Sequence, residues 1–262
     1  MAMTFGYQPL LSTHKSSFYY GNQVGCHEIS LEIVSGQFLA VVGESGSGKS
    51  TLLKMLAREI EPSSGQITFQ SDSYGKVDLT QLPEVRRRQL RRKEIGLVTQ
   101  RPSDGLRMHI SVGGNVAERV LVNGVRHYGQ ARELARHWLQ KLELDLERMD
   151  ELPIRFSIGM QQRVQIAKVL ASSPRLLLLD EPTSGLDVSV QARLLDVLQQ
   201  IVREQNLAVI LVTHDLAVAR MMSDSMVVMQ NGRVVESGLT DQVLDDPQHA
   251  YTQLLTSSIL PA

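Results

Sequence analysis

The chain reads Gly43-Glu44-Ser45-Gly46-Ser47-Gly48-Lys49-Ser50 between an apolar stretch and a helical one. Residues 38–42 are all apolar, as in a buried strand, and residues 51–57 have the pattern of a helix that the loop opens. The glycines let successive backbone amides curl around a phosphate, and the helix N-terminus adds partial positive charge. The stretch therefore predicts a loop that binds the phosphates of a nucleotide.

Each residue type in this loop suits a task at a bound nucleotide. We expect Lys49 to reach the β- and γ-phosphates and the Ser50 hydroxyl to bind Mg²⁺. The predicted nucleotide-binding residues of this segment are Gly43, Glu44, Ser45, Gly46, Ser47, Gly48, Lys49, Ser50 and Thr51. A glycine-rich turn with an unrelated lysine is the structural alternative, and the flanking strand and helix argue against it.

The chain is long enough for one large α/β domain or for a core with a subdomain, and it contains no run that could span a membrane. The chain has 262 residues, of which 42% are hydrophobic, and its formal net charge of −1 gives no overall field to attract nucleic acid. The single cysteine, Cys26, excludes an internal disulfide and a multi-cysteine metal site. No apolar run approaches the length of a membrane helix. We expect a cytoplasmic protein with no direct membrane insertion.

Apolar and alternating segments predict a mainly parallel core sheet. Strands covered on both faces are expected at residues 38–42, 95–99, 175–179 and 207–212. Alternation at 28–33 and a further β-like segment at 66–69 predict a small antiparallel sheet beside this core. Residues 225–236 predict a hairpin with a type I′ turn at Asn231-Gly232.

Strand signals disappear between residues 101 and 155. Leu134, Trp138 and Leu142 recur at helical spacing, which predicts a buried stripe with Trp138 in the core. We expect Gly113-Gly114 to break this part into separate helices. The predicted organisation is a single domain over 10–258, with a core at 10–100 and 172–258 and a helical subdomain at 101–171.

Residues 86–93 read Arg-Arg-Arg-Gln-Leu-Arg-Arg-Lys, just before a predicted strand. This basic run could be a phosphate-binding patch or a solvated helix face whose charges offset Glu84 and Glu94. We favour the second interpretation because the whole chain is nearly neutral. No nucleic-acid binding is predicted from it.

Polar residues follow four of the predicted strands, namely the Gly43 loop, Gln100, Asp180-Glu181 and His214. Ligands bind outside the carboxyl ends of parallel strands, so we expect these side chains to converge on one γ-phosphate. Asp180 and Gln100 would join Ser50 in holding Mg²⁺, and Glu181 would orient the attacking water. His214 on its own would be an ordinary strand-end histidine, but its place beside Asp180-Glu181 favours a catalytic role.

In their order and spacing, these residues resemble the ATP-binding cassette (ABC) ATPases over nearly the whole chain. The matching stretches are Walker A at Gly43–Ser50, the Q-loop at Gln100, Walker B with the catalytic glutamate at Leu177–Glu181, the D-loop at Ser184–Asp187 and the H-loop at His214. Tyr20 is similar to the aromatic residue that stacks on adenine in this family. The resemblance implies a P-loop NTPase fold and a Mg²⁺-dependent ATPase that binds ATP.

The signature motif of that family, Leu-Ser-Gly-Gly-Gln, is similar to Phe156-Ser157-Ile158-Gly159-Met160. The resemblance implies a head-to-tail dimer with two shared ATP sites, each completed by the other copy's Ser157, Ile158, Gly159, Met160 and Asp187. We expect Ser157 to cap the following helix. Ile158 replaces the motif's first glycine, so its side chain is expected to crowd the partner's nucleotide or to resist a positive φ. ATP-driven closure would then be weakened without being lost.

Two subfamily resemblances point to different partners. Residues 246–255 resemble the tail of peptide and nickel importer ATPases. Stretches at 104–107, 113–119, 126–129 and 185–196 resemble the K-type ATP-binding subunits of carbon–phosphorus lyase systems. The second resemblance implies a dimer that remodels a soluble carbon–phosphorus lyase core in phosphonate catabolism. An importer ATPase and a weakly hydrolysing, ATP-dependent scaffold are the alternatives.

Overall fold

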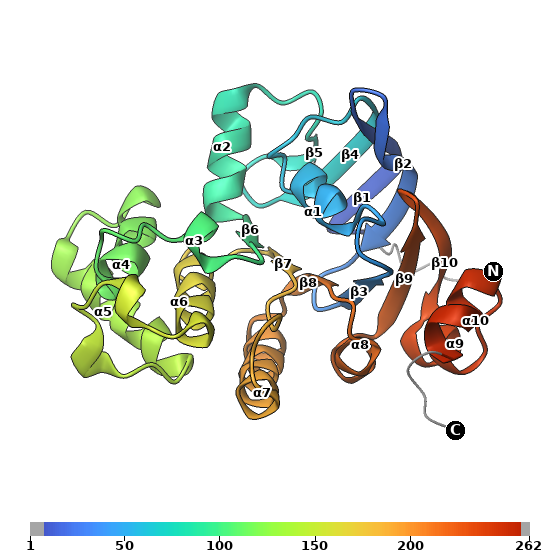
Figure 1. Ribbon diagram of the computed structural model, residues 1–262. Coiled ribbons are helices and arrows are strands. Elements are labelled where there is room, and N and C mark those ends of the chain that lie inside the picture. The colour runs from blue at the N-terminus through green and yellow to red at the C-terminus, as the bar shows by residue number, and fades with distance from the viewer. Residues whose placement is uncertain (1–7, 258–262) are drawn as a thin grey trace, which may run out of the picture.

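A six-stranded sheet forms the centre of the molecule (Figure 1). The computed structural model describes residues 8–257, and the expected domain end at residue 258 lies just outside this range. In sheet order the strands are β10 (Arg233–Leu239), β9 (Ser225–Gln230), β3 (Phe38–Val42), β8 (Ala208–Val212), β7 (Leu176–Asp180) and β6 (Ile95–Val98). All neighbours pair in parallel except β9 and β10. The predicted α/β fold with a mainly parallel core is confirmed.

The core strands are buried because alternate side chains enter two different hydrophobic clusters. In β7, Leu177 and Leu179 pack in the cluster shared with the helical part of the chain. Leu176 and Leu178 pack on the other face, with α1 (Lys49–Leu56) and the smaller sheet. Each buried leucine contributes about 1.5–3 kcal/mol relative to an exposed one. The parallel register aligns the carboxyl end of β7 with that of β8, pairing Asp180 with Val212.

The smaller sheet is antiparallel, with the order β2-β1-β4-β5. Its strands are β1 (Leu11–Tyr20), β2 (Gln23–Ile33), β4 (Ser64–Ser71) and β5 (Gly75–Asp78). The strands expected at 28–33 and 66–69 are present, whereas β1 and β5 had no clear sequence signal. Polar side chains of β1 are buried through hydrogen bonds, since the Thr13 hydroxyl donates to the Ile29 carbonyl and the Ser16 hydroxyl to that of Gln66. Because these buried side chains are polar, β1 lacks the alternation of apolar and polar residues that would predict a half-buried strand.

Helices cover the core, and the C-terminal part of the chain lies at the β10 edge (Figure 1). Besides α1, the core helices are α2 (Glu84–Lys93), α7 (Val188–Gln205), α8 (Leu216–Met222), α9 (Thr240–Asp245) and α10 (Ala250–Ser257). The β9–β10 hairpin turns at Asn231 and Gly232, whose φ values are +50° and +75°. Positive φ at both residues is what a type I′ turn requires, as predicted.

The residues between β6 and β7 form only helices, gathered at the β6 end of the molecule (Figure 1). They are α3 (Pro102–Gly105), α4 (Val112–Val122), α5 (Tyr128–Lys141) and α6 (Ile158–Leu170), with 3₁₀ turns at Leu146–Arg148 and Pro153–Arg155. Trp138 is buried as predicted. Leu134 was wrongly placed in the buried stripe, because α5 turns Ala131 and Ala135 inward and leaves Leu134 42% exposed.

Gly113-Gly114 does not separate two helices, contrary to the sequence expectation. Both glycines lie in the first turn of α4, where the amide of Gly114 donates to the capping hydroxyl of Ser111 at 3.1 Å. A Cβ added to Gly113 would lie 2.6 Å from the Cε atom of Met149. Close packing against Met149 therefore accounts for Gly113.

The basic run lies on α2, where its charges are partly paired. Arg88 and Arg91 each contact the Glu84 carboxylate, at 2.7 and 3.0 Å. The sequence-based expectation that Glu94 also offsets this run is wrong. Glu94 is buried and accepts hydrogen bonds from the Ser71 hydroxyl and the Asp72 amide. It ties the β4–β5 turn to the start of β6.

Candidate functional site

The loop between β3 and α1 is held tightly by its neighbours. Gly43, Gly46 and Gly48 have φ values of +145°, +81° and +103°, in the region that glycine adopts without strain. A Cβ on Gly43 would lie 2.2 Å from the Met229 carbonyl oxygen, and one on Gly48 would lie 2.3 Å from that of Gly25. Among residues 8–257, no side chain caps α1 at Gly48. The first-turn amides of α1 thus remain available to a phosphate.

Lys49 is folded back into this loop. Its side chain is buried, and Nζ donates to the carbonyl oxygens of Gly43 and Glu44 at 2.8 and 2.7 Å. Burial lowers the pKa of Lys49, and the nearby carboxylates of Glu181 and Asp180 oppose this shift. A phosphate in the loop would stabilise the buried ammonium by direct contact.

The predicted strand-end residues meet at the Glu181 carboxylate. Gln100 Nε2 donates to Glu181 Oε2 at 2.8 Å, and His214 Nδ1 lies 3.2 Å from Glu181 Oε1. Glu181 itself has a φ of +45°, a left-handed conformation that costs a non-glycine residue about 1 kcal/mol or more. The Glu181 amide donates to the Val212 carbonyl at 3.0 Å, which helps to hold this conformation. Both carboxylate oxygens are therefore oriented by neighbouring strand ends.

Ser50 and Asp180 form a second oxygen pair beside the loop. The Ser50 hydroxyl donates to Asp180 Oδ1 at 3.0 Å. Burial raises the pKa of Asp180. A divalent cation here would favour the ionised carboxylate. Residues 8–257 contain no group of three or more His, Cys, Asp or Glu side chains that could hold a metal. This donor set fits Mg²⁺, which keeps several waters and takes its remaining oxygens from one or two carboxylates and from substrate phosphates.

Most of the predicted residues line one cavity of about 530 Å³, a size typical of small-molecule sites. Those lining it are Tyr20, Ser45, Gly46, Gly48, Lys49, Ser50, Thr51, Gln100, Glu181 and His214. Gly43, Glu44, Ser47 and Asp180 adjoin it through the contacts of Lys49 and Ser50. The Tyr20 ring is half exposed at the mouth, with its hydroxyl 3.4 Å from Thr51 Oγ1. An exposed aromatic face beside a phosphate loop can stack on a nucleotide base.

Sequence reasoning missed the segment Gln23-Val24-Gly25, which also lines this cavity. A Cβ on Gly25 would lie 2.8 Å from the Thr51 methyl group and 3.1 Å from the Tyr20 ring. The only available signal was a glycine within the strand that follows Tyr20. This segment fixes Tyr20 and Thr51 beside each other.

The predicted signature residues lie outside the cavity. Ser157, Ile158 and Asp187 are exposed, Met160 is half-buried, and Gly159 packs against Leu186 and Val190. Ser157 caps α6 as predicted, since its hydroxyl accepts from the Met160 amide at 3.3 Å. The helix begins at Ile158, directly after this cap. In this structure, the chain does not bring these residues to its own phosphate loop.

Ile158 is not strained in this position. It is the first residue of α6 and is absent from the positive-φ residues of the described chain, so the expected backbone resistance is wrong. Its side chain is 62% exposed. The predicted crowding of a partner's nucleotide therefore rests on the side chain alone.

Two further contacts to this site were not predicted. On α6, the Gln165 side-chain amide lies 2.6 Å from Thr99 Oγ1 in either amide orientation, which links the helical part of the chain to the residue before Gln100. On α10, the Tyr251 hydroxyl accepts from the Glu44 amide at 2.9 Å. Tyr251 is buried against the core below the loop. Helix α10 thus contacts the phosphate loop through this hydrogen bond.

Replacing Tyr251 with phenylalanine should weaken ATP binding about fivefold, because one hydrogen bond that orients the loop is lost and the Glu44 amide stays unpaired. The measurement is the ATP Kd by fluorescence titration. Tyr128→Phe, on the exposed start of α5, is the matched control. An ATP Kd equal to that of the wild type would show that Tyr251 does not position the loop.

The family profile described as "ABC transporter" matches residues 26–184, more than half of the chain. This match covers the phosphate loop, Gln100, the signature region and Glu181. The chain belongs to the ABC transporter family and is one of its ATP-binding subunits, an ATP hydrolase.

Among curated relatives, the chain is 52% identical over 253 residues to the "Putative phosphonates utilization ATP-binding protein PhnK" of Escherichia coli (strain K12). That alignment covers 97% of this chain and 98% of PhnK. This chain is also 38% identical over 230 residues to the "Dipeptide transport ATP-binding protein DppF" of Escherichia coli (strain K12). That alignment covers 88% of this chain and 67% of DppF.

Solved structures of similar fold are ABC cassettes. The dimeric bacterial ABC transporter cassette MJ0796 aligns with a TM-score of 0.80 and 27% identity, over 88% of this chain and 98% of that one. CbiO1 from Clostridium perfringens, part of the complex cbiONQ, aligns with a TM-score of 0.78 and 28% identity, over 92% of each chain. None of the helices between residues 8 and 257 has the length and hydropathy needed to cross a membrane.

Proposed function

We propose that this protein is a cytoplasmic, Mg²⁺-dependent ATPase that pairs head to tail with a second copy and uses ATP turnover to remodel a soluble carbon–phosphorus lyase core complex in phosphonate catabolism. The observation that carries the pathway is the 52% identity to PhnK over nearly the full length of both chains. The observation that carries the chemistry is the cavity where the phosphate loop meets Gln100, Glu181 and His214.

Within one chain, the proposed roles follow from these contacts. Tyr20 stacks on adenine, and Lys49 with the α1 amides holds the phosphates. Ser50, Asp180 and Gln100 hold Mg²⁺, which neutralises charge on the phosphate oxygens. Glu181 orients the attacking water.

Gln100 and His214 position the Glu181 carboxylate, since each contacts one of its oxygens. Such positioning keeps the carboxylate in place as the phosphoryl group transfers. The left-handed backbone of Glu181 supports the same proposal, because strain of this kind persists where the surroundings hold a functional residue in place.

The second copy would complete each site. The signature residues are exposed and lie outside the chain's own cavity, while the capped N-terminus of α6 offers amides to a phosphate. Ser157, Ile158, Gly159, Met160 and Asp187 would therefore face the ATP of the partner. The dimeric MJ0796 cassettes, one of them bound to ADP and Pi, support this arrangement.

An importer ATPase with a membrane partner is the second candidate, favoured by the 38% identity to DppF and by the tail at 246–255. The two candidates share their chemistry and differ in the partner. Co-purification of tagged Glu181→Gln protein in the presence of ATP, followed by mass spectrometry, separates them, with Lys49→Ala as the nucleotide-free control. We expect soluble lyase subunits to co-purify with the tagged Glu181→Gln protein. Recovery of permease proteins without any lyase subunit would overturn the partner assignment.

The exposed side chain of Ile158 favours a third candidate, a scaffold that binds ATP and hardly hydrolyses it. In our proposal Ile158 only slows closure, so Ile158→Gly should raise the ATPase rate about fivefold, which corresponds to roughly 1 kcal/mol of relieved crowding. Ile154→Gly removes a similarly exposed isoleucine nearby and serves as the control. An unchanged rate would show that Ile158 does not slow turnover. A wild-type rate no higher than that of Glu181→Gln would establish the scaffold instead.

A further inference from the structure

Gln165, on α6, is a buried polar side chain that has no part in the catalytic roles proposed above. Only 1% of its surface is exposed to solvent. A buried amide group costs free energy unless its donor and its acceptor are both paired. The partners of Gln165 therefore show what this residue holds in place.

The main partner of Gln165 is Thr99, the residue before Gln100. With the Gln165 amide oriented so that all its neighbours are satisfied, its oxygen accepts from the Thr99 backbone amide at 2.9 Å. In the same orientation its nitrogen donates to the Thr99 carbonyl at 3.1 Å and to Gln162 Oε1 at 3.3 Å. Gln165 thus pairs with both backbone groups of Thr99.

These contacts extend to the residue after Gln100. The Thr99 hydroxyl lies 2.6 Å from the Gln165 amide and 3.0 Å from the Arg101 carbonyl oxygen. Gln100 itself is exposed, and its Nε2 donates to Glu181 Oε2 at 2.8 Å. The backbone on both sides of Gln100 is therefore tied to α6.

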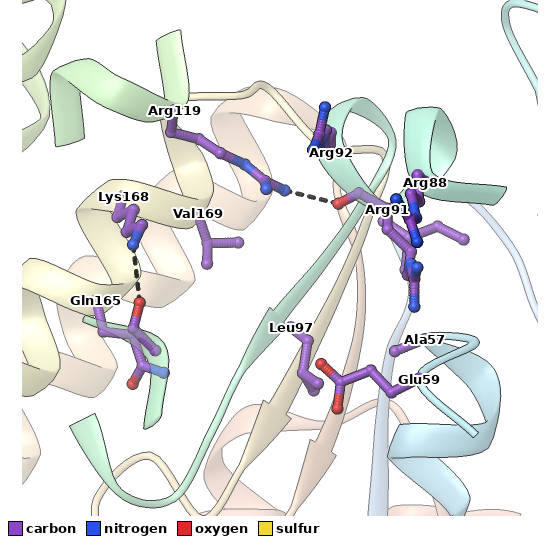
Figure 2. Close-up of a pocket in the computed structure, with 12 residues that line it drawn as sticks. Ala57, Glu59, Arg88, Arg91, Arg92, Leu97, Arg119, Gln165, Lys168 and Val169 are labelled. Atoms are coloured by element: carbon purple, nitrogen blue, oxygen red, sulfur yellow. Dashed lines mark hydrogen bonds between the residues drawn. The ribbon is translucent and has the colours of Figure 1, made fainter. Parts of the chain in front are cut away.

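Gly105, the last residue of α3, leaves the space that Gln165 occupies. A Cβ added to Gly105 would lie 2.0 Å from the end of the Gln165 side chain. The φ of Gly105 is not positive, so the close approach of Gln165 is what requires glycine here. The Gly105 carbonyl also accepts from Nζ of Lys168, which lies on α6 near Gln165, at 2.9 Å (Figure 2). Gln165 and its neighbour on α6 thus contact both ends of the segment 99–105.

These contacts do more than satisfy the backbone of Thr99. Thr99 follows β6, the edge strand of the core sheet, and backbone groups at a sheet edge can bind water instead. Pairing them with a buried side chain of α6 fixes Thr99 relative to that helix. An apolar side chain at position 165 would fill the same space without fixing Thr99 in this way.

We propose that Gln165 is a positioning residue for ATP hydrolysis, which holds the segment 99–105 so that the Gln100 amide meets the Glu181 carboxylate. Gln165 does not line the ATP cavity and acts only through its contacts with this segment. Without them the Gln100 side chain samples more orientations, and Glu181 is less often held in the productive geometry. The effect on hydrolysis rests on the proposed roles of Gln100 and Glu181, whereas the effect on the segment does not.

Three substitutions weaken the contact in different ways. Gln165→Met keeps the length of the side chain and removes its hydrogen bonds, and Thr99→Val removes only the hydroxyl. Gly105→Ala leaves both partners intact and places a methyl group where the Gln165 amide lies. The matched controls are Gln199→Met, which removes a glutamine hydrogen bond on α7, and Gly129→Ala, which adds a methyl group to an open position on α5.

Steady-state ATPase assays of the full chain test the effect on hydrolysis. Each variant at the contact should lower kcat about three- to tenfold, the effect of one or two hydrogen bonds, and leave the KM for ATP within about twofold of the wild type. Both controls should match the wild type. Thr99 and Gly105 are partly exposed, so their variants keep the test valid even if Gln165→Met does not fold. An unchanged kcat in all three variants would overturn the proposal.

A double-mutant comparison shows whether Gln165 acts through Gln100. In a Gln100→Ala background, Gln165→Met should cause no further loss of kcat, because the side chain that it positions is already gone. The same fold loss in both backgrounds would show that Gln165 has only a structural role, and would overturn the proposal.

Hydrogen–deuterium exchange of the nucleotide-free chain distinguishes a failure of this inference from a failure of the proposed function. Peptides that cover residues 99–106 should exchange faster in Gln165→Met and Gly105→Ala than in the wild type, because the Thr99 amide loses its acceptor. Unchanged exchange would overturn positioning by Gln165 whatever the ATPase rates are. Wild-type hydrolysis by Gln100→Ala would instead refute the proposed role of Gln100, while faster exchange would still support the hold of Gln165 on this segment.

Discussion

Lys49→Ala should raise the ATP Kd more than about a hundredfold, because the buried ammonium is the main side-chain charge facing the phosphates and charge-assisted contacts are the strongest hydrogen bonds in such sites. Equilibrium binding of a fluorescent ATP analogue, with Mg²⁺ present, measures the change. ATPase activity should fall to background with it.

Lys54→Ala is the matched control, since Lys54 is exposed on the same helix. It should bind ATP as the wild type does. The Lys49 variant also loses hydrogen bonds to Gly43 and Glu44, so a melting curve without nucleotide must accompany the binding data. ATP affinity within a factor of about three of the wild type in folded Lys49→Ala would contradict the phosphate-loop assignment.

Glu181→Gln should leave ATP binding intact and lower the hydrolysis rate by about 10²–10⁴-fold. The amide keeps the size of the side chain but loses the negative charge that we propose orients water, and it has one acceptor oxygen in place of the two that face Gln100 and His214. The measurements are the ATP Kd and the single-turnover rate of phosphate release. Because ATP then persists in the site, the variant should also form a stable dimer on addition of ATP, visible by size-exclusion chromatography.

Glu133→Gln, on the exposed face of α5, is the control and should hydrolyse ATP at the wild-type rate. The His214–Glu181 contact offers a second comparison, since His214→Ala removes a positioning group and leaves the carboxylate. Its rate should fall between those of the wild type and Glu181→Gln. Hydrolysis at the wild-type rate in Glu181→Gln would place the water-orienting group elsewhere.

The core sheet was predictable because its strands are apolar enough for their sequences alone to indicate burial on both faces. Phe38–Val42 and Leu176–Asp180 are almost wholly aliphatic, and strands covered on both faces tolerate little else. β1 could not be predicted, because buried Thr13 and Ser16 satisfy their hydroxyls across strands that are distant in sequence. Leu134 was misjudged for a related reason, since helical spacing defines a stripe without showing which stripe the neighbouring helices cover.

The gathering of the phosphate loop, Gln100, Glu181 and His214 around one cavity was predictable because each of them directly follows an apolar strand. The contacts that hold it were not. Tyr251 meets Glu44 across 207 positions of sequence, and Gln165 meets Thr99 across 66. Nothing local to Tyr251 or Gln165 distinguishes either residue from an ordinary helix residue, because their roles arise from packing between distant segments.

The shared ATP site is the central claim, and mixing two inactive variants tests it most directly. Lys49→Ala disables the phosphate loop, and Ser157→Arg blocks the exposed start of α6, so each homodimer has two defective sites. A mixed dimer has one site with both defects and one with neither. Equal mixing should restore about a quarter of the wild-type ATPase rate, because half of the dimers are mixed and each has one intact site. A mixture as inactive as its components, with mixed dimers shown by mass spectrometry to have formed, would contradict the account.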